Sequence, residues 1–114
     1  MTAPRLKRVY EAPTAGDGMR VLVDRLWPRG LSKDAAKVDL WLKEVAPSDA
    51  LRREFHAHPE RFEAFRAAYA AELEGSEALA RLRSLARAQP VTLLYAARDE
   101  AHNNAVVLRE LVAR

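Results

Sequence analysis

The sequence predicts an α/β fold, with a small, partly parallel sheet of about three or four strands flanked by four to six helices. Two observations carry this prediction. Residues 20–24 are short, apolar and β-branched at their centre, as expected for a strand covered on both faces, and residues 91–96 are the strongest strand pattern in the chain. Several helical patterns separate these two segments, and helices between buried strands are typical of parallel pairing. A length of 114 residues fits one domain, 1–114.

Strand and turn signals organise the first 30 residues. Residues 6–10 alternate weakly between apolar and polar side chains and predict a first strand. A turn-rich stretch follows over 11–19, where Asp17-Gly18 favours a tight hairpin into the strand 20–24. Trp27-Pro28 is expected to end that strand, because Pro28 restricts the residue before it and cannot continue the ladder.

Capping residues divide the middle of the chain into helices. Ser32 is expected to cap a short helix through Lys37, Asp39 a second one, and Ser48 a third. Pro59 suits the first turn of a better-defined helix. The apolar residues of that helix recur at helical spacing and predict a buried stripe: Phe62, Phe65, Tyr69 and Leu73.

Two more helices surround the strand 91–96. Ser76 is expected to cap the first, and Pro90 ends it. Asp99 is expected to cap the final helix. Capping is then an alternative to any role of Asp99 in a binding site. Asn103 and Asn104 are poor residues for a first helical turn, so at least one of them is expected to make a specific hydrogen bond.

Composition excludes several classes of protein. The absence of cysteine excludes disulfides, thiolate metal sites and cysteine nucleophiles. No apolar run approaches the roughly 20 residues that span a bilayer, and no apolar signal core follows the start, so we expect a cytoplasmic protein with no membrane partner. Common hydrolase, metal and nucleotide motifs are absent. No metal site and no cofactor is therefore predicted.

Charge is unevenly distributed along the chain. The net charge is only +3, but residues 1–33 hold seven basic and three acidic side chains, residues 34–74 six and nine, and residues 75–114 six and four. The two ends are thus basic and the middle is acidic. This balance permits contact with nucleic acid without requiring it, because a solvated surface gives the same composition.

Polar side chains follow both predicted buried strands. Because parallel strands end at one edge of a sheet, these side chains are expected to meet there. Asp24 and Arg25 are the catalytic candidates: Arg25 would clamp an anion together with Arg29, and Asp24 would orient Arg25 or act as a general base. An alternative is that both serve structural pairing. The ligand-binding candidates are Trp27, Arg29, Lys33, Tyr95, Arg98, Asp99 and Asn104.

These residues favour binding of an anionic or phosphorylated small molecule. Guanidinium groups present planar forks to phosphate or carboxylate, and a helix start favours negative charge. Trp27 would form a pocket wall, unless it only packs in the core. Whether the protein is an enzyme stays open, as does its oligomeric state. The alternatives are a nucleic-acid-associated accessory protein and a non-catalytic interaction module.

A longer pattern resembles a known family. The block Arg20-Val-Leu-Val-Asp-Arg-Leu-Trp-Pro-Arg-Gly30, with Trp41-Leu-Lys43 and Thr92-Leu-Leu-Tyr95, resembles the domain of unknown function 488 family in its YeaO-like branch. The resemblance covers nearly the whole chain and implies a small α/β protein without supplying a reaction. Members of the wider family look like they carry a Cys at the end of the last strand and a Cys-His-Arg run at the following helix. Here Tyr95 and residues 102–104 stand at those places, so thiol chemistry is not carried over.

Overall fold

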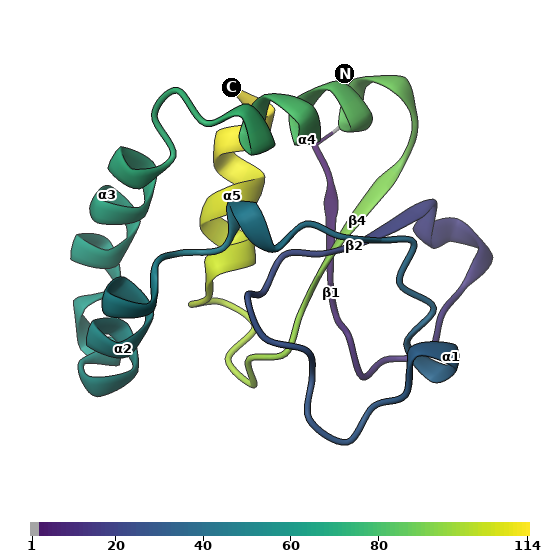
Figure 1. Ribbon diagram of the computed structural model, residues 1–114, viewed down its shortest axis with the longest axis horizontal. Helices are drawn as coiled ribbons and strands as arrows, with labels where there is room; N and C mark the ends of the chain where they lie inside the picture. The colour runs from purple at the N-terminus through teal and green to yellow at the C-terminus, as the bar shows by residue number, and fades with distance from the viewer. Residues whose placement is uncertain (1–2) are drawn as a thin grey trace.

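A four-stranded sheet forms the centre of the molecule (Figure 1). The structure is a computed structural model and describes residues 3–114. The strand order is β1-β4-β2-β3, and all three neighbouring pairs are parallel. All four carboxyl ends therefore lie at one edge of the sheet. The strands are β1 (Arg5–Arg8), β2 (Met19–Leu22), β3 (Leu40–Trp41) and β4 (Val91–Tyr95).

Within residues 3–114, five α-helices and three short 3-10 helices lie between the strands or after the last one, which confirms the α/β prediction. The α-helices are α1 (Lys33–Ala36), α2 (Asp49–Ala57), α3 (Phe62–Glu72), α4 (Glu77–Ala88) and α5 (Asn104–Ala113). The 3-10 helices are η1 (Ala15–Asp17), η2 (Lys43–Val45) and η3 (Pro59–Arg61). Among the helices of residues 3–114, none combines the length and the apolar character needed to cross a bilayer.

The two strands on which the site prediction depends lie side by side in the same direction. Val21 is level with Leu93 and Leu22 with Leu94, and the Val23 N–H donates to the Leu94 carbonyl at 3.1 Å. This register confirms that residues 24 and 96 reach the same edge. All five residues of β4 are buried, as expected of a central strand.

Side chains of the central strands alternate between two core layers. On one face, Val21 and Leu93 pack against α3, α4 and α5. On the other face, Leu22 and Leu94 pack against Ala36 of α1 and the tryptophans that flank it. Successive strand residues point to opposite faces, so burial of both sets requires cover on both sides of the sheet.

Most helix starts follow the capping predictions. The hydroxyls of Ser32, Ser48 and Ser76 each accept a hydrogen bond from the backbone N–H three residues later, at 3.1–3.2 Å. Each bond satisfies a backbone donor that the first helical turn leaves without a partner. The predicted stripe of α3 is buried as well.

Two local predictions in the first half of the chain are wrong. The Asp17-Gly18 turn does not make a hairpin, because β4 lies between β1 and β2 and both pair with it in parallel. Asp39 does not cap a helix either. Its carboxylate accepts the Arg20 N–H at 2.8 Å, and the following two residues pair with β2 as the edge strand β3. Long-range strand pairing, which leaves little local signal, decides both cases.

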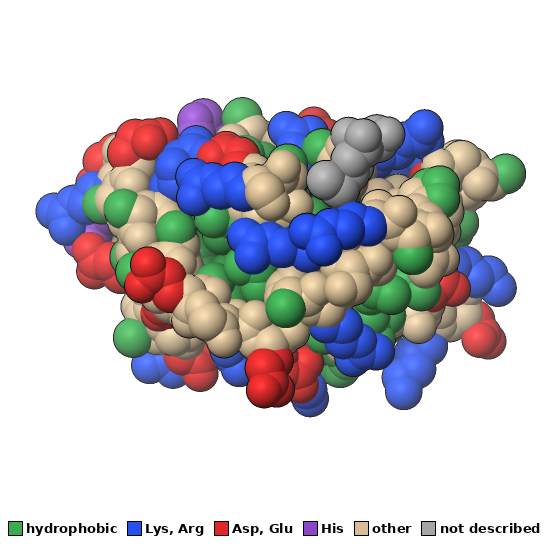
Figure 2. Space-filling model, turned by 90° about the horizontal axis from the view of Figure 1, so that it is seen from above, with side chains coloured by type: hydrophobic (Ala, Val, Ile, Leu, Met, Phe, Trp, Pro, Cys, Tyr) green, Lys and Arg blue, Asp and Glu red, His purple; other side chains and the backbone are tan. Residues whose placement is uncertain are grey.

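Basic side chains gather in the middle of one face of the molecule, with acidic side chains around them (Figure 2). This face is the top of Figure 1, where α4 and the C-terminus lie. Helix α4 contributes Arg81, Arg83 and Arg87 to the basic total, and Glu77 begins it. Both signs of charge are therefore mixed on this face.

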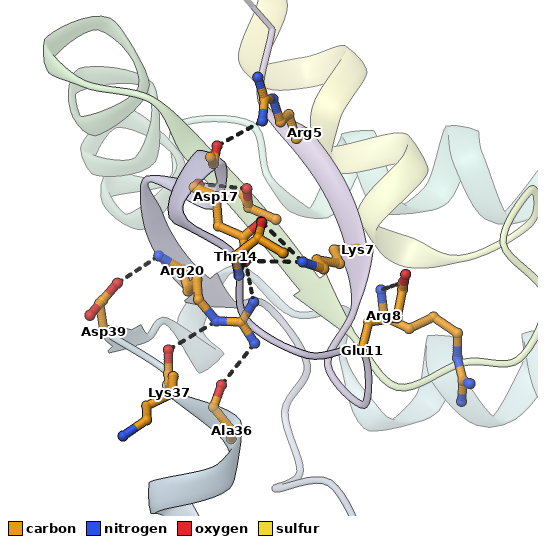
Figure 3. A network of polar contacts seen from close by, with 12 residues as sticks. Arg5, Lys7, Arg8, Glu11, Thr14, Asp17, Arg20, Ala36, Lys37 and Asp39 are labelled. Carbon is orange, nitrogen blue, oxygen red and sulfur yellow. Dashed lines mark hydrogen bonds and ion pairs between the residues drawn. The ribbon is translucent and has the colours of Figure 1, made fainter.

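A buried ion pair holds the start of β2 (Figure 3). Asp17 and Arg20 are 5% and 3% exposed, and Arg20 Nη1 lies 2.6 Å from Asp17 Oδ2. The remaining guanidinium nitrogens donate to the carbonyls of residues 36 and 37, at 2.8 and 3.0 Å. Lys7 Nζ, the Thr14 hydroxyl and the Thr14 backbone N–H complete the partners of the Asp17 carboxylate, at 3.1, 2.8 and 3.1 Å. We call Lys7, Asp17 and Arg20 the buried clamp.

Candidate functional site

A pocket of about 470 Å³ opens at the carboxyl edge of the sheet, where β2 and β4 end. Its walls come from the segments after these two strands and from α2. The structure brings six of the nine predicted site residues into its lining: Asp24, Arg25, Trp27, Arg29, Arg98 and Asn104. The volume lies within the range of about 300–1,000 Å³ that is typical of small-molecule sites.

Asp24 fastens the two strand ends to each other and to α5. Its Oδ2 accepts the Ala96 N–H at 2.9 Å, which extends the pairing of β2 and β4 by one side-chain bond. Its Oδ1 accepts the Asn104 Nδ2–H at 3.2 Å, and the same amide donates to the Val23 carbonyl at 3.2 Å. Asn104 therefore makes the specific bond expected of it.

Burial raises the pKa of the Asp24 carboxyl above its ordinary value. The Ala96 N–H, the Asn104 amide and the positive charge of His56 act in the opposite direction but do not outweigh the lost hydration. The charged form is therefore less favoured in the fold than in the unfolded chain.

We expect Asp24→Asn to change how stability depends on pH. A carboxyl with a raised pKa binds its proton more tightly in the folded state, so the free energy of unfolding falls as pH rises from the ordinary value through the raised one. The variant lacks this loss, and its stability relative to the wild type should increase from pH 4 to pH 8. Urea unfolding at several pH values measures the difference, and a constant difference would contradict the assignment.

Asn103, and not Asp99, caps the final helix. Asn103 Oδ1 accepts the Val106 N–H at 3.0 Å, whereas Asp99 Oδ1 accepts the N–H groups of residues 101 and 102 at 2.9 and 3.0 Å in the turn before the helix. These backbone bonds, opposed by slight desolvation and aided by His102, lower the pKa of Asp99. Both residue types cap helices well, and the turn that Asp99 makes shifts the helix start to Asn104.

Three predicted residues lie outside the pocket lining. Asp99 is in the preceding turn, Lys33 is exposed at the first position of α1, and Tyr95 points into the core with 2% of its surface exposed. Burial raises the pKa of the Tyr95 phenol. Alternation along β4 explains its position, because Leu93 and Tyr95 share the core face.

Trp27 both packs and lines the pocket. Its Nε1–H donates to the Leu31 carbonyl at 2.7 Å, and its ring meets that of Trp41 edge to face, with centroids 5.5 Å apart. Trp41 in turn donates to the Asp24 carbonyl at 2.8 Å. The indole is thus fixed in place as a rigid part of the wall.

Three arginines of the lining make no ion pair within residues 3–114: Arg25, Arg29 and Arg98. The Arg25 guanidinium is half-buried, and its one hydrogen bond in that range is a long one of 3.4 Å to the Pro47 carbonyl. Asp24 is the single acidic side chain of the lining. The pocket is therefore rich in positive charge that the described chain leaves available.

Sequence reasoning missed the contribution of α2. Arg52, Phe55 and His56 line the pocket and share one helix face, because they are spaced at i, i+3 and i+4. That spacing was visible in the sequence, but nothing local indicated that the face meets the sheet edge. Tyr10 is a further lining residue, and its hydroxyl donates to the Arg29 carbonyl at 2.9 Å.

Tyr69 supports the floor behind the pocket. Its hydroxyl, fully buried, donates to the Val45 carbonyl. Burial and the nearby carboxylates of Asp24 and Glu72 raise the pKa of the phenol. The hydroxyl therefore acts as a neutral hydrogen-bond donor. Within residues 3–114, no group of three or more His, Asp or Glu side chains is placed to hold a metal ion.

Comparison with known proteins identifies the family. Residues 4–114 match the family model DUF488-N3i, described as the inactive DUF488-N3 subclade. The chain belongs to this family. No solved structure matches the chain significantly.

Relatives of this DUF488-N3i chain occur in Mycobacterium and Escherichia. An uncharacterized protein of Mycobacterium tuberculosis (strain H37Rv) is 48% identical over 111 residues, which cover 97% of this chain and 94% of the relative. The uncharacterized protein YeaO of Escherichia coli K12 is 46% identical over 105 residues, or 91% of each chain. This similarity confirms the YeaO-like resemblance.

Proposed function

We propose that the pocket binds an anionic, phosphorylated small molecule, with Arg25, Arg29 and Arg98 as the anion-binding side chains. One observation carries the proposal: basic side chains without carboxylate partners in the described chain converge on a pocket of ligand size. Guanidinium groups bind phosphate through parallel hydrogen bonds and lose little hydration in doing so. A bound anion would supply the partners that the protein itself does not.

Binding is favoured over catalysis by the state of Asp24. Both of its carboxylate oxygens accept hydrogen bonds, from Ala96 and Asn104, so the side chain already has a positioning task at the sheet edge. The description of the matched subclade as inactive supports the same choice. General-base catalysis by Asp24 stays a prediction, and the proposed function does not depend on it.

The test is anion binding by the wild type and by Arg25→Gln, measured with inorganic phosphate and sulfate by isothermal titration calorimetry at low salt. We expect the variant to bind about 10-fold to 100-fold more weakly, the loss of one hydrogen-bonded charge. The long Arg25 contact with Pro47 contributes little, so the fold should remain intact. Circular dichroism and thermal unfolding check this.

Arg53→Gln is the matched control. Arg53 is exposed on α2 and is not part of the lining, so its loss removes the same net charge at a site near the pocket. We expect nearly wild-type anion affinity from this variant. If both variants weaken binding equally, the loss comes from the lower net charge of the protein and not from a specific site. Wild-type affinity in Arg25→Gln would refute the proposed site.

A further inference from the structure

We propose that the ligand is a phosphomonoester attached to a flat heterocyclic ring, the chemistry of a nucleoside monophosphate, and that α2 supplies both of its main contacts. Arg52 binds the phosphate, and Phe55 packs against the ring. This inference rests on the proposed anion-binding function and names its ligand class. Neither residue was a candidate from the sequence.

One buried nitrogen of the Arg52 guanidinium has no hydrogen-bond acceptor among the described residues. Its Nε is shielded from solvent and has no hydrogen-bond partner within residues 3–114. Its other described contact is a long one of 3.5 Å from Nη2 to Asp49 Oδ1, at the surface. A buried donor without an acceptor destabilises the fold, more so when it is charged. A structure rarely keeps such a donor unless something outside the chain completes it.

A phosphate group fits this donor better than a single acceptor atom does. Because Nε is shielded from water, a phosphate reaches it only when the partly exposed Arg52 side chain turns toward the pocket. The Nε and one Nη, which point in parallel, can then contact two oxygens of one phosphate. Arg52 lines the same pocket as Arg25 and Arg98, so the negative charges of a phosphomonoester meet several cations at once. Tetrahedral phosphate presents enough oxygens for all of them.

The size and the apolar lining of the pocket fit a ligand larger than an inorganic ion. About 470 Å³ is several times the space that a phosphate fills, and much of the lining is apolar or aromatic. Phe55 stacks on Phe65 at a centroid distance of 4.5 Å, which fixes its ring, yet it is only half-buried. Trp27 adds a second rigid aromatic surface. Flat heterocycles gain from contact with such surfaces.

Helix α2 is suited to carry these contacts to a ligand. None of its residues is fully buried, and its main packing is with α3 and η3. Phe55 packs one side of its ring against Phe65 of the core, while Arg52 and the rest of Phe55 line the pocket. The phosphate and the ring would each join α2 to the sheet edge.

The experiment compares defined probes by isothermal titration calorimetry: AMP, UMP, ribose 5-phosphate, adenosine and inorganic phosphate. We expect at least one of the two nucleotides to bind 10-fold or more tightly than ribose 5-phosphate and phosphate, and adenosine to bind weakly. Arg52→Gln should weaken nucleotide binding by 10-fold or more. Phe55→Leu should weaken nucleotide binding while leaving the affinity for ribose 5-phosphate unchanged. Arg53→Gln is again the control.

The outcomes separate this inference from the proposed function. If ribose 5-phosphate or phosphate binds as tightly as both nucleotides, and Arg25→Gln weakens that binding, the ring is refuted and the anion pocket stands. If Arg52→Gln, folded by circular dichroism, binds nucleotides like the wild type, the role of α2 is refuted. If none of the phosphorylated probes binds, both the ligand class and the anion pocket are refuted.

Discussion

Arg20→Met is expected to lower the free energy of unfolding by about 3–5 kcal/mol, the usual cost of breaking a buried ion pair. The substitution keeps the length of the side chain but removes every donor. Asp17 then loses its closest cation, and the carbonyls of residues 36 and 37 lose their hydrogen bonds. Urea unfolding followed by circular dichroism measures the effect.

Arg81→Met is the control for this variant. Arg81 is exposed on α4, and its side chain makes no hydrogen bond or ion pair within residues 3–114, so its replacement should change stability by less than about 0.5 kcal/mol. A loss below 1 kcal/mol in Arg20→Met would show that the buried clamp is not the main fastening of β2.

The buried clamp also sets how stability responds to acid. Burial by itself would raise the pKa of Asp17, but hydrogen bonds from Thr14, Lys7 and Arg20 outweigh it and hold the pKa far below the ordinary value. A carboxyl with a lowered pKa stabilises the fold above its ordinary pKa, and this stabilisation disappears as pH falls towards the lowered value. Part of the clamp's contribution is therefore lost in strong acid.

Gly18→Ala is expected to lower the free energy of unfolding by at least about 3 kcal/mol. Gly18 has a φ of +65°, and a β-carbon built there would lie 2.3 Å from the Pro90 carbonyl oxygen. That oxygen accepts the Met19 N–H at 2.9 Å, the bond with which β2 begins to pair with β4. The added methyl group would therefore push apart the two central strands.

Gly75→Ala separates the two causes of this loss. Gly75 has a similar φ of +70°, but a β-carbon there meets nothing within 4 Å. Its replacement should cost only about 1 kcal/mol, the strain of a left-handed alanine. The excess loss in Gly18→Ala then measures the steric clash together with the strain of its ψ of −141°, which lies outside the left-handed helical region. Equal losses for the two variants would contradict the importance of the close approach.

The parts of the fold that sequence predicted are those with local causes. Serine caps, the apolar stripe of α3 and the buried character of the two central strands each depend on residues within a few positions of one another. Parallel pairing of those strands also followed, because helices between buried strands restrict the topology. The carboxyl edge of β2 and β4 was therefore predictable as the location of the pocket.

The parts that failed depend on partners far along the chain. Asp39 has the chemistry of a helix cap. Its carboxylate instead accepts the N–H of Arg20, which lies 19 residues earlier in the chain, and this bond places it beside β2. Arg52 and Phe55 have ordinary helical spacing, and their place in the pocket requires α2 to lie beside the sheet edge. Tyr95 follows a buried strand, but the alternation of β4 turns its ring into the core.

The outer strands of the sheet limit how this protein could recruit others. Three of the four residues of β1 are basic, and β3 has only two residues. Short or positively charged borders discourage the addition of foreign strands, which protects against aggregation and against peptide capture by β-augmentation. Any protein that associates with this chain is thus expected to bind through side-chain contacts and not by adding a strand to the sheet.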